Sequence, residues 1–292
     1  MTKRAVVVGI NDYSAQGFSN LSGCVHDADA AYHLLIDAFL FDPAQVFLYT
    51  DAKATSSNIL RALNYVLRIS EPGDVACFYY AGHGGLHPAS QPSTFYQTII
   101  PHSGRFITDW DLWRAADQLK PSEVNFTVIL DSCHSGGMID PQAPTGNVRT
   151  IANAQEFVNT VVSTMQTVVP FGIALPDLAT LSNNVHVAVP APLATVCYTE
   201  AANREFLPQA KATLLAASRW DEYAGESPIH GFLTQAILTT VNTSNFAISH
   251  RELHSTLTPL VHTAAGHEQH PVLRGQENRM DGIFLRGFND TR

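Results

Sequence analysis

The sequence VACFYYAGHGG, residues 75–85, joins an unbroken apolar run to a turn bounded by glycines. A second segment, ILDSCHSGG at residues 129–137, repeats this arrangement, and its Cys133 follows His83 by 50 positions. Each pattern predicts a buried β-strand that ends at a tight turn and presents one reactive side chain. Because strand ends hold such groups rigidly, the two segments together predict a cysteine nucleophile with a histidine base.

The rest of the first half alternates strand and helix patterns. The predicted strands cover residues 5–10, 46–50, 75–80 and 124–130, with a short extended piece at 97–101, and the predicted helices cover residues 27–39, 55–69 and about 108–118. Thr55 is the expected N-cap of the second helix. This alternation predicts an α/β fold with a mainly parallel central sheet flanked by helices. Sites in such sheets lie beyond the carboxyl ends of the strands, where His83 and Cys133 both fall.

A proline-rich segment divides the second half. Residues 138–210 hold seven of the 16 prolines and are expected to be a linker or insertion. Regular patterns then return as a strand at 211–218, a helix at 231–241, a helix at 249–264 and two short strands at 272–273 and 283–285.

Composition limits the class of protein. The 292 residues are 45% hydrophobic and 15% charged, which favours a folded domain with a large core. The formal net charge of −9 argues against a nucleic-acid partner. The four cysteines are widely spaced, which favours a reduced protein over a disulfide framework. The apolar residues 5–10 are too short to span a membrane, so we expect a cytoplasmic location and no membrane association.

The two glycine-bounded turns suit cysteine chemistry. An imidazole at His83 can take the proton of the Cys133 thiol, and the backbone N–H groups of Gly84 and Cys133 can hold a developing oxyanion. A lone cysteine or histidine is more often structural, but here two such turns coincide. A zinc site built from His83, His87, Cys133 and His134 is disfavoured by its irregular spacing. We therefore expect no required cofactor.

Five segments resemble the metacaspases and their prokaryotic relatives, the orthocaspases. The segments are AGHG at 81–84, DSCHSGG at 131–137, GCVHDA at 23–28, TLLAAS at 213–218 and HGFLT at 230–234. The spacing from His83 to Cys133 is the one given for caspases. The resemblance implies a caspase-like (caspase-hemoglobinase) sandwich. It divides the chain into a large-subunit-like catalytic region at 1–137, the linker at 138–210 and a small-subunit-like region at 211–292, together one domain.

By the same resemblance the chain is a cysteine endopeptidase that cleaves after Arg or Lys. Its acidic primary pocket would hold Asp27 and Asp131, with Ser218 lining the cleft and Trp220 shaping a neighbouring subsite. A carboxylate pair binds a guanidinium or ammonium group through charge-assisted hydrogen bonds and repels an acidic side chain. Taken singly, Asp27 also reads as a carboxylate capping its own helix, and Asp131 as a strand-end residue capping the next turn.

The resemblance also has implications for how the peptidase activity is regulated. Many metacaspases need calcium, but residues 86–111 hold only Asp109 and Asp111, so Ca²⁺ activation is not favoured. Arg149 is a candidate self-cleavage point in the linker.

We expect a monomer acting on basic, Arg- or Lys-containing peptides. Two alternatives remain: a catalytically silent scaffold of the same fold, and a related cysteine peptidase with a preference for Asn.

Overall fold

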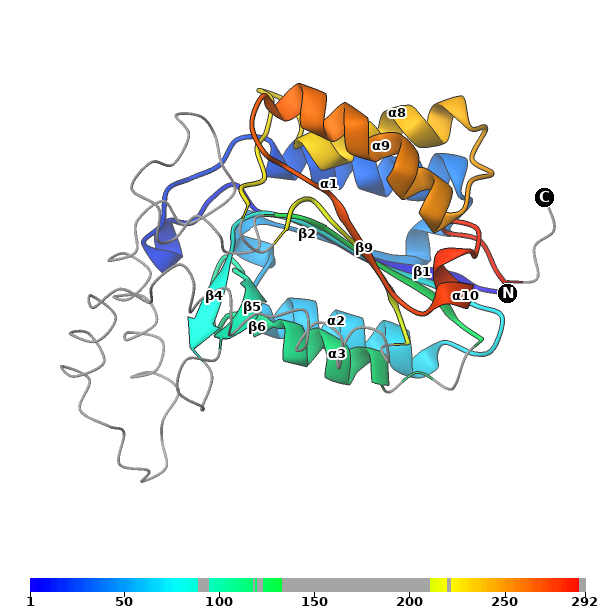
Figure 1. The fold of residues 1–292 in the computed structure, drawn as a ribbon. Coiled ribbons are helices and arrows are strands. Elements are labelled where there is room, and N and C mark those ends of the chain that lie inside the picture. Colours follow the sequence, from blue (N-terminus) through cyan, green and yellow to red (C-terminus); the bar gives the residue numbers. More distant parts are fainter. Residues whose placement is uncertain (89–94, 118, 120–122, 133–210, 220–221, 289–292) are drawn as a thin grey trace.

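The computed structural model describes residues 1–88, 95–117, 119, 123–132, 211–219 and 222–288. Cys133, Arg149 and Trp220, and the whole segment 138–210, lie outside these described residues. A six-stranded sheet runs through the middle of the molecule (Figure 1). Its order is β2 (Val46–Thr50), β1 (Lys3–Gly9), β3 (Val75–Ala81), β7 (Asn125–Asp131), β8 (Thr213–Ala216) and β9 (Val272–Arg274).

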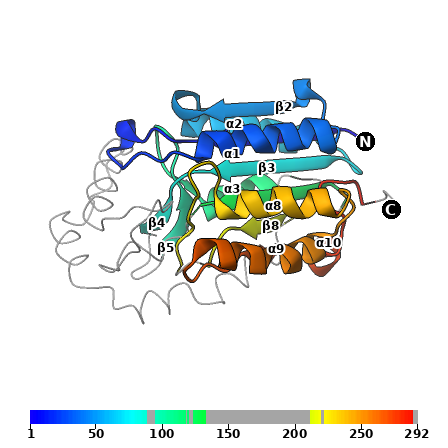
Figure 2. The ribbon, with the colours of Figure 1, turned by 90° about the horizontal axis from the view of Figure 1, so that it is seen from above.

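The sheet is parallel except at one edge, where β9 runs antiparallel to β8. Three helices cover one face: α1 (Cys24–His33, continued by a π-helical turn at Leu34–Ala38), α8 (Phe232–Thr243) and α9 (His250–Ala265). In Figure 2 these three helices lie side by side above the strands. The opposite face carries α2 (Ser56–Ile69) and α3 (Asp109–Asp117). This arrangement confirms the predicted α/β fold with helices on both faces.

Local sequence explains where these helices begin and end. The Thr55 hydroxyl accepts a hydrogen bond from the Asn58 amide at 3.2 Å, so the predicted N-cap of α2 is confirmed. α9 begins with a capping box between Ser249 and Glu252, and it ends at Gly266, whose φ of 66° is the left-handed conformation that glycine adopts without strain. The remaining helical pieces are α10 (Glu277–Met280) and 3₁₀ turns at Ser14–Gln16, Pro43–Gln45 and Asp51–Lys53.

Two cores lie on the two faces of the sheet because alternate residues of a strand point to opposite sides. In β3, Phe78 and Tyr80 pack in the core under α2 and α3, whereas Cys77 and Tyr79 pack under α1, α8 and α9. All seven residues of this strand are buried. The continuous apolar run at 75–80 is therefore the pattern of a strand covered on both faces.

A second, small antiparallel sheet was not predicted. It consists of β4 (Gly84–Pro88), β5 (Phe95–Ile99) and β6 (Ile107–Thr108), and β4 starts directly after His83. Only an extended piece at 97–101 was expected, because a strand that opens with two glycines carries no apolar alternation.

The predicted strand at 283–285 was wrong. Ile283 forms only an isolated bridge to Ser249, and Leu285 has a φ of 53°, which breaks an extended run. No helix in the described part of the chain has the length and apolar character needed to cross a bilayer.

Candidate active site

His83 occupies a corner between the two sheets, beyond the carboxyl end of β3. The preceding residue, Gly82, has no room for a side chain: a Cβ there would lie 2.3 Å from the Tyr13 hydroxyl and 2.5 Å from the Tyr80 hydroxyl. The glycine of this motif is thus required by the close approach of two tyrosines. His83 itself is only 2% exposed.

The imidazole of His83 has a defined orientation. Its Nε2 lies 2.8 Å from the carbonyl oxygen of Ser19. Because a carbonyl only accepts, Nε2 carries the proton, and in the neutral ring Nδ1 then holds the lone pair of a base. The ring packs against Tyr13 at a centroid distance of 4.5 Å and against Phe18 at 6.4 Å. These contacts hold the ring in one position.

Two buried tyrosines fix the backbone of His83. The Tyr13 hydroxyl accepts a hydrogen bond from the His83 amide at 2.7 Å, and the Tyr80 hydroxyl donates to the His83 carbonyl at 2.7 Å. The two hydroxyls are 3.0 Å apart. Burial, and to a smaller extent the neighbouring Tyr80, raises the pKa of Tyr13 well above its usual value. Tyr13 therefore keeps its proton. Neither tyrosine was predicted from the sequence, although Tyr80 lies inside a buried strand, where a tyrosine hydroxyl needs a polar partner.

The strand register brings the two motifs together. β3 and β7 are neighbours, with Ala81 opposite Asp131. The Gly82 amide donates to the Asp131 carbonyl at 3.4 Å. His83 and Cys133 each follow these paired residues by two positions. The predicted juxtaposition of the strand ends is therefore observed, while the thiol itself lies outside the described residues.

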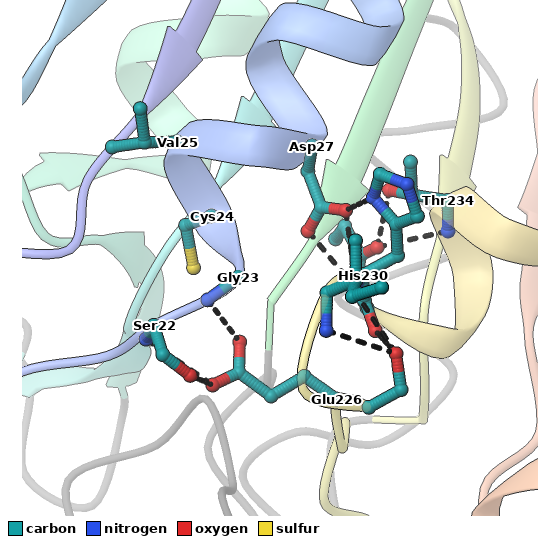
Figure 3. A network of polar contacts seen from close by, with 12 residues as sticks. Ser22, Gly23, Cys24, Val25, Asp27, Glu226, His230 and Thr234 are labelled. Atoms are coloured by element: carbon teal, nitrogen blue, oxygen red, sulfur yellow. Dashed lines mark hydrogen bonds and ion pairs between the residues drawn. The ribbon is translucent and has the colours of Figure 1, made fainter.

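Asp27 and Asp131 meet the same helix end. Asp131 accepts hydrogen bonds from the amide and the hydroxyl of Thr234, the amide at 2.9 Å. Asp27 accepts from the His230 ring at 2.8 Å and from the Gly231 amide at 3.1 Å, as Figure 3 shows. Both aspartates are fully buried.

This contact satisfies the first turn of α8, whose N-cap, Gly231, has no side chain to offer. Asp131 binds the amide of the third helical residue, as an N-cap side chain would, and Asp27 binds the amide of the N-cap itself. The positive end of the helix dipole stabilises both carboxylates. Asp27 lies in the first turn of α1, yet Gly23 is the N-cap of that helix, so Asp27 serves α8 rather than its own helix.

The beginning of α1 is held by two further side chains. Glu226 accepts hydrogen bonds from the Ser22 hydroxyl at 3.0 Å and from the Gly23 amide at 3.2 Å (Figure 3). Asn11 accepts from the amide of Cys24 at 2.9 Å. These contacts link α1 to the loop before α8 and so fix Asp27 relative to Asp131. They join positions far apart in the chain, and no local pattern predicts them.

Ser218 lies just beyond β8, at the same edge of the sheet. Ser218 is 1% exposed, and its hydroxyl donates a hydrogen bond to the Glu222 carbonyl at 3.3 Å. The hydroxyl is thus turned toward its own loop. The Ala217 amide donates to the Leu130 carbonyl, which keeps Ser218 beside the end of β7.

The two aspartates considered for calcium, Asp109 and Asp111, have different hydrogen-bond partners. Asp111 forms a two-point ion pair with Arg105 at 2.6 and 2.9 Å. Burial acts to raise the pKa of Asp111, but hydrogen bonds from Arg105 and Thr108 hold it below its usual value. Asp109 accepts from the Gln97 amide instead. Calcium prefers several oxygen ligands around one ion, so weak or absent calcium dependence stays a prediction.

Comparison with known families shows what this chain is similar to. Residues 3–142 match the family model described as Metacaspase, peptidase C14 domain. This part of the chain therefore resembles the metacaspases. Metacaspase-4 of Arabidopsis thaliana is 35% identical over 149 residues, which is 48% of this chain and 35% of that protein. Metacaspase-9 of the same plant is 26% identical over 317 aligned positions, covering 96% of each chain.

A fungal relative, metacaspase-1 of Coccidioides immitis, is 30% identical over 150 residues and is covered over 32% of its length. The match thus spans about a third of most of these metacaspases, and nearly all of metacaspase-9. Solved structures agree on the fold. Protein GSU0716 from Geobacter sulfurreducens superposes with a TM-score of 0.70 at 16% identity, covering 99% of this chain and 100% of its own. Caspase-1 from Spodoptera frugiperda superposes with a TM-score of 0.52 at 11% sequence identity, covering 99% of this chain and 92% of its own.

Proposed function

We propose that this protein is a cysteine endopeptidase that cleaves peptide bonds after Arg or Lys, with His83 as base and Cys133 as nucleophile. One observation carries the proposal. The Ser19 carbonyl orients the His83 ring so that Nδ1 holds its lone pair, beside the strand whose motif supplies the cysteine. His83 also lies at the edge where parallel sheets place their ligands.

The chemistry follows from these positions. His83 takes the proton of the Cys133 thiol, and the thiolate attacks the carbonyl carbon of the scissile bond. The amides of Gly84 and Cys133 stabilise the resulting oxyanion. The carbon–nitrogen bond then breaks, and His83 returns the proton to the leaving amine. Water, deprotonated by His83, hydrolyses the acyl-enzyme and regenerates the thiol.

The preference for a basic residue is assigned to Asp27 and Asp131. Both carboxylates are buried against α8, where the amides of Gly231 and Thr234 donate to them and the His230 ring donates to Asp27. A substrate guanidinium or ammonium group provides the opposite charge, whereas an acidic side chain is repelled. Ser218, at the end of β8, is assigned to the same pocket by motif position, although its hydroxyl points to the Glu222 carbonyl. Self-processing at Arg149 belongs to this proposal because the bond after it has the required basic residue.

The test compares wild type with Cys133→Ala on fluorogenic peptides ending in Arg, Lys, Asp or Asn, each with calcium and with chelator. We expect cleavage after Arg and Lys that vanishes in the variant and that depends little on calcium. Cys77→Ala is the matched control: this thiol is buried, and desolvation raises its pKa to about 12, so its loss should leave activity in place.

Three outcomes would contradict the proposal in whole or in part. Arginyl cleavage that survives in Cys133→Ala would exclude the nucleophile. A wild-type chain whose Cys133 resists alkylation by an arginyl electrophile, and which cleaves none of the four peptides, would instead indicate a silent scaffold. Cleavage only after Asn would retain the dyad and reject the role given to the two aspartates.

A further inference from the structure

A cluster of three possible metal ligands lies at the end of α9, outside the candidate active site. His262 stands in the last turn of the helix, and Glu268 and His270 follow the helix-ending Gly266. The ligand atoms of the three side chains lie within 4.8 Å of one another. Within the described ranges, this is the one group of histidine, cysteine and carboxylate side chains gathered so closely.

The backbone holds Glu268 and His270 on the same side. Gln269, between them, is fully buried: its oxygen accepts from the Gly225 amide at 3.0 Å, and its nitrogen donates to the Ala217 carbonyl at 3.2 Å. The side chains of Glu268 and His270, on either side of Gln269, both reach the surface. The side chain of Glu268 is 75% exposed, so it can rotate to meet an ion.

His270 is oriented in the way that metal-binding histidines commonly are. Its Nδ1 lies 2.6 Å from a carboxylate oxygen of Glu222, and its own backbone amide donates to the other oxygen at 2.7 Å. The carboxylate accepts the Nδ1 proton and leaves the Nε2 lone pair available for an ion. Nε2 is 3.4 Å from Glu268, and the His262 ring stacks on the His270 ring at 5.4 Å and 28°.

We infer that His262, Glu268 and His270 bind a divalent transition metal, with Zn²⁺ the best fit, and that Glu222 is the positioning residue for His270. Two imidazoles and one carboxylate form a donor set that suits zinc, and three protein ligands leave one position for water. The site is independent of the proposed peptidase activity.

The site is tied to the loop that carries Ser218. Glu222, which orients His270, also accepts from the Arg219 amide at 3.2 Å, and Gln269 holds the Gly225 amide. Opening this loop would pull Glu222 and Gln269 away from the ligand-bearing segment. A bound metal therefore opposes that opening and slows hydrogen exchange of the Gly225 amide.

The experiment uses the full chain with Cys133→Ala, so that the candidate nucleophile cannot capture zinc. Calorimetric titration with ZnCl₂ should show one saturable site that weakens about tenfold or more in His262→Ala and in His270→Ala. Glu222→Gln should weaken binding by roughly 10- to 100-fold although it touches no metal. His33→Ala is the control, because His33 is an exposed helical histidine near two aspartates whose ligand atoms are not gathered.

His262→Ala decides the question, since this exposed helical position tolerates alanine without loss of folding. Zinc should slow exchange at Gly225 in the parent and not in this variant. Equal zinc affinity in the parent and in His262→Ala would overturn the inference, as would binding that never saturates. Zinc protection of Gly225 that persists in His262→Ala would place the ion elsewhere and overturn it too.

Discussion

The carbonyl oxygen of Ser19 lies 2.8 Å from Nε2 of His83, and this contact decides which ring nitrogen acts as a base. Ser19 belongs to the loop between β1 and α1, and Tyr13 from the same loop binds the His83 amide. One loop thus sets both the backbone and the ring of the candidate base. In the proposed mechanism, the residues of this loop act only by positioning His83.

Tyr13→Phe tests this arrangement. It leaves the buried His83 amide without its acceptor and removes one of the partners of the Tyr80 hydroxyl, so we expect a loss of about 1–3 kcal/mol in unfolding free energy. In the assay, kcat should fall with little change in KM, since Tyr13 positions the base and is not placed in the substrate pocket. The control is Tyr65→Phe, at a site 44% exposed. An unchanged kcat in Tyr13→Phe would reject the positioning role.

Thr234→Val tests the link between Asp131 and α8. The change keeps the shape of the side chain but removes a hydroxyl that donates to Asp131 and lies 2.5 Å from the Tyr79 hydroxyl. We expect a loss of about 1–3 kcal/mol in urea unfolding and a higher KM for arginyl peptides. Thr239→Val, on the same helix, loses only an exposed bond and should change neither. Equal stability of the two variants would show that the Thr234 hydroxyl does not stabilise the contact between Asp131 and α8.

Asp27→Asn and Asp131→Ala test the acidic pocket. Hydrogen bonds to charged groups contribute about 1.5–3 kcal/mol, so each variant should lose roughly 10- to 100-fold or more in kcat/KM on arginyl peptides, and Asp131→Ala should abolish cleavage. Asp29→Asn, exposed on the same helix as Asp27, is the control. Circular dichroism must show that each chain is folded. Full arginyl activity in folded Asp131→Ala would exclude it from the pocket.

Because of the buried His250, we expect the unfolding free energy of the protein to fall in acid. Burial lowers its pKa from 6.5 to about 4, opposed by the Gly282 carbonyl and assisted by Arg279. The neutral ring is fully satisfied, donating through Nδ1 to Gly282 and accepting at Nε2 from Thr127. In the unfolded chain, His250 takes up a proton near its ordinary pKa of 6.5, whereas in the folded protein it does so only near pH 4. The contribution of the neutral ring to stability is therefore fully present above pH 6.5 and is lost as the pH falls toward 4. The loss is about 3 kcal/mol.

Urea unfolding at pH 7.5 and pH 5 measures this effect. The slope of stability with pH should flatten in His250→Gln and persist in His26→Gln, which changes an exposed histidine. A wild-type stability that does not change between these two pH values would show that His250 is not the titrating group.

Much of the candidate site could be predicted from sequence because its parts are local. Apolar runs marked β3 and β7, and the glycines marked where they end, so the edge that carries His83 and the DSC motif followed directly. The Thr55 cap of α2 was equally local. Neither the Tyr13 contacts nor the Glu226 bridge to Ser22 had any such signal, because each joins residues separated by dozens of positions or more.

The sequence by itself determined the element types and the order of the motifs, since side-chain periodicity and turn chemistry act over a few neighbouring residues. Only the tertiary structure decided which helix Asp27 serves, which carbonyl orients His83, and that a sheet starts at Gly84. These features depend on which buried polar groups form hydrogen bonds with one another when elements distant in the sequence pack together. Buried groups must be satisfied, and the partner is chosen by the packed fold rather than by adjacency in the chain.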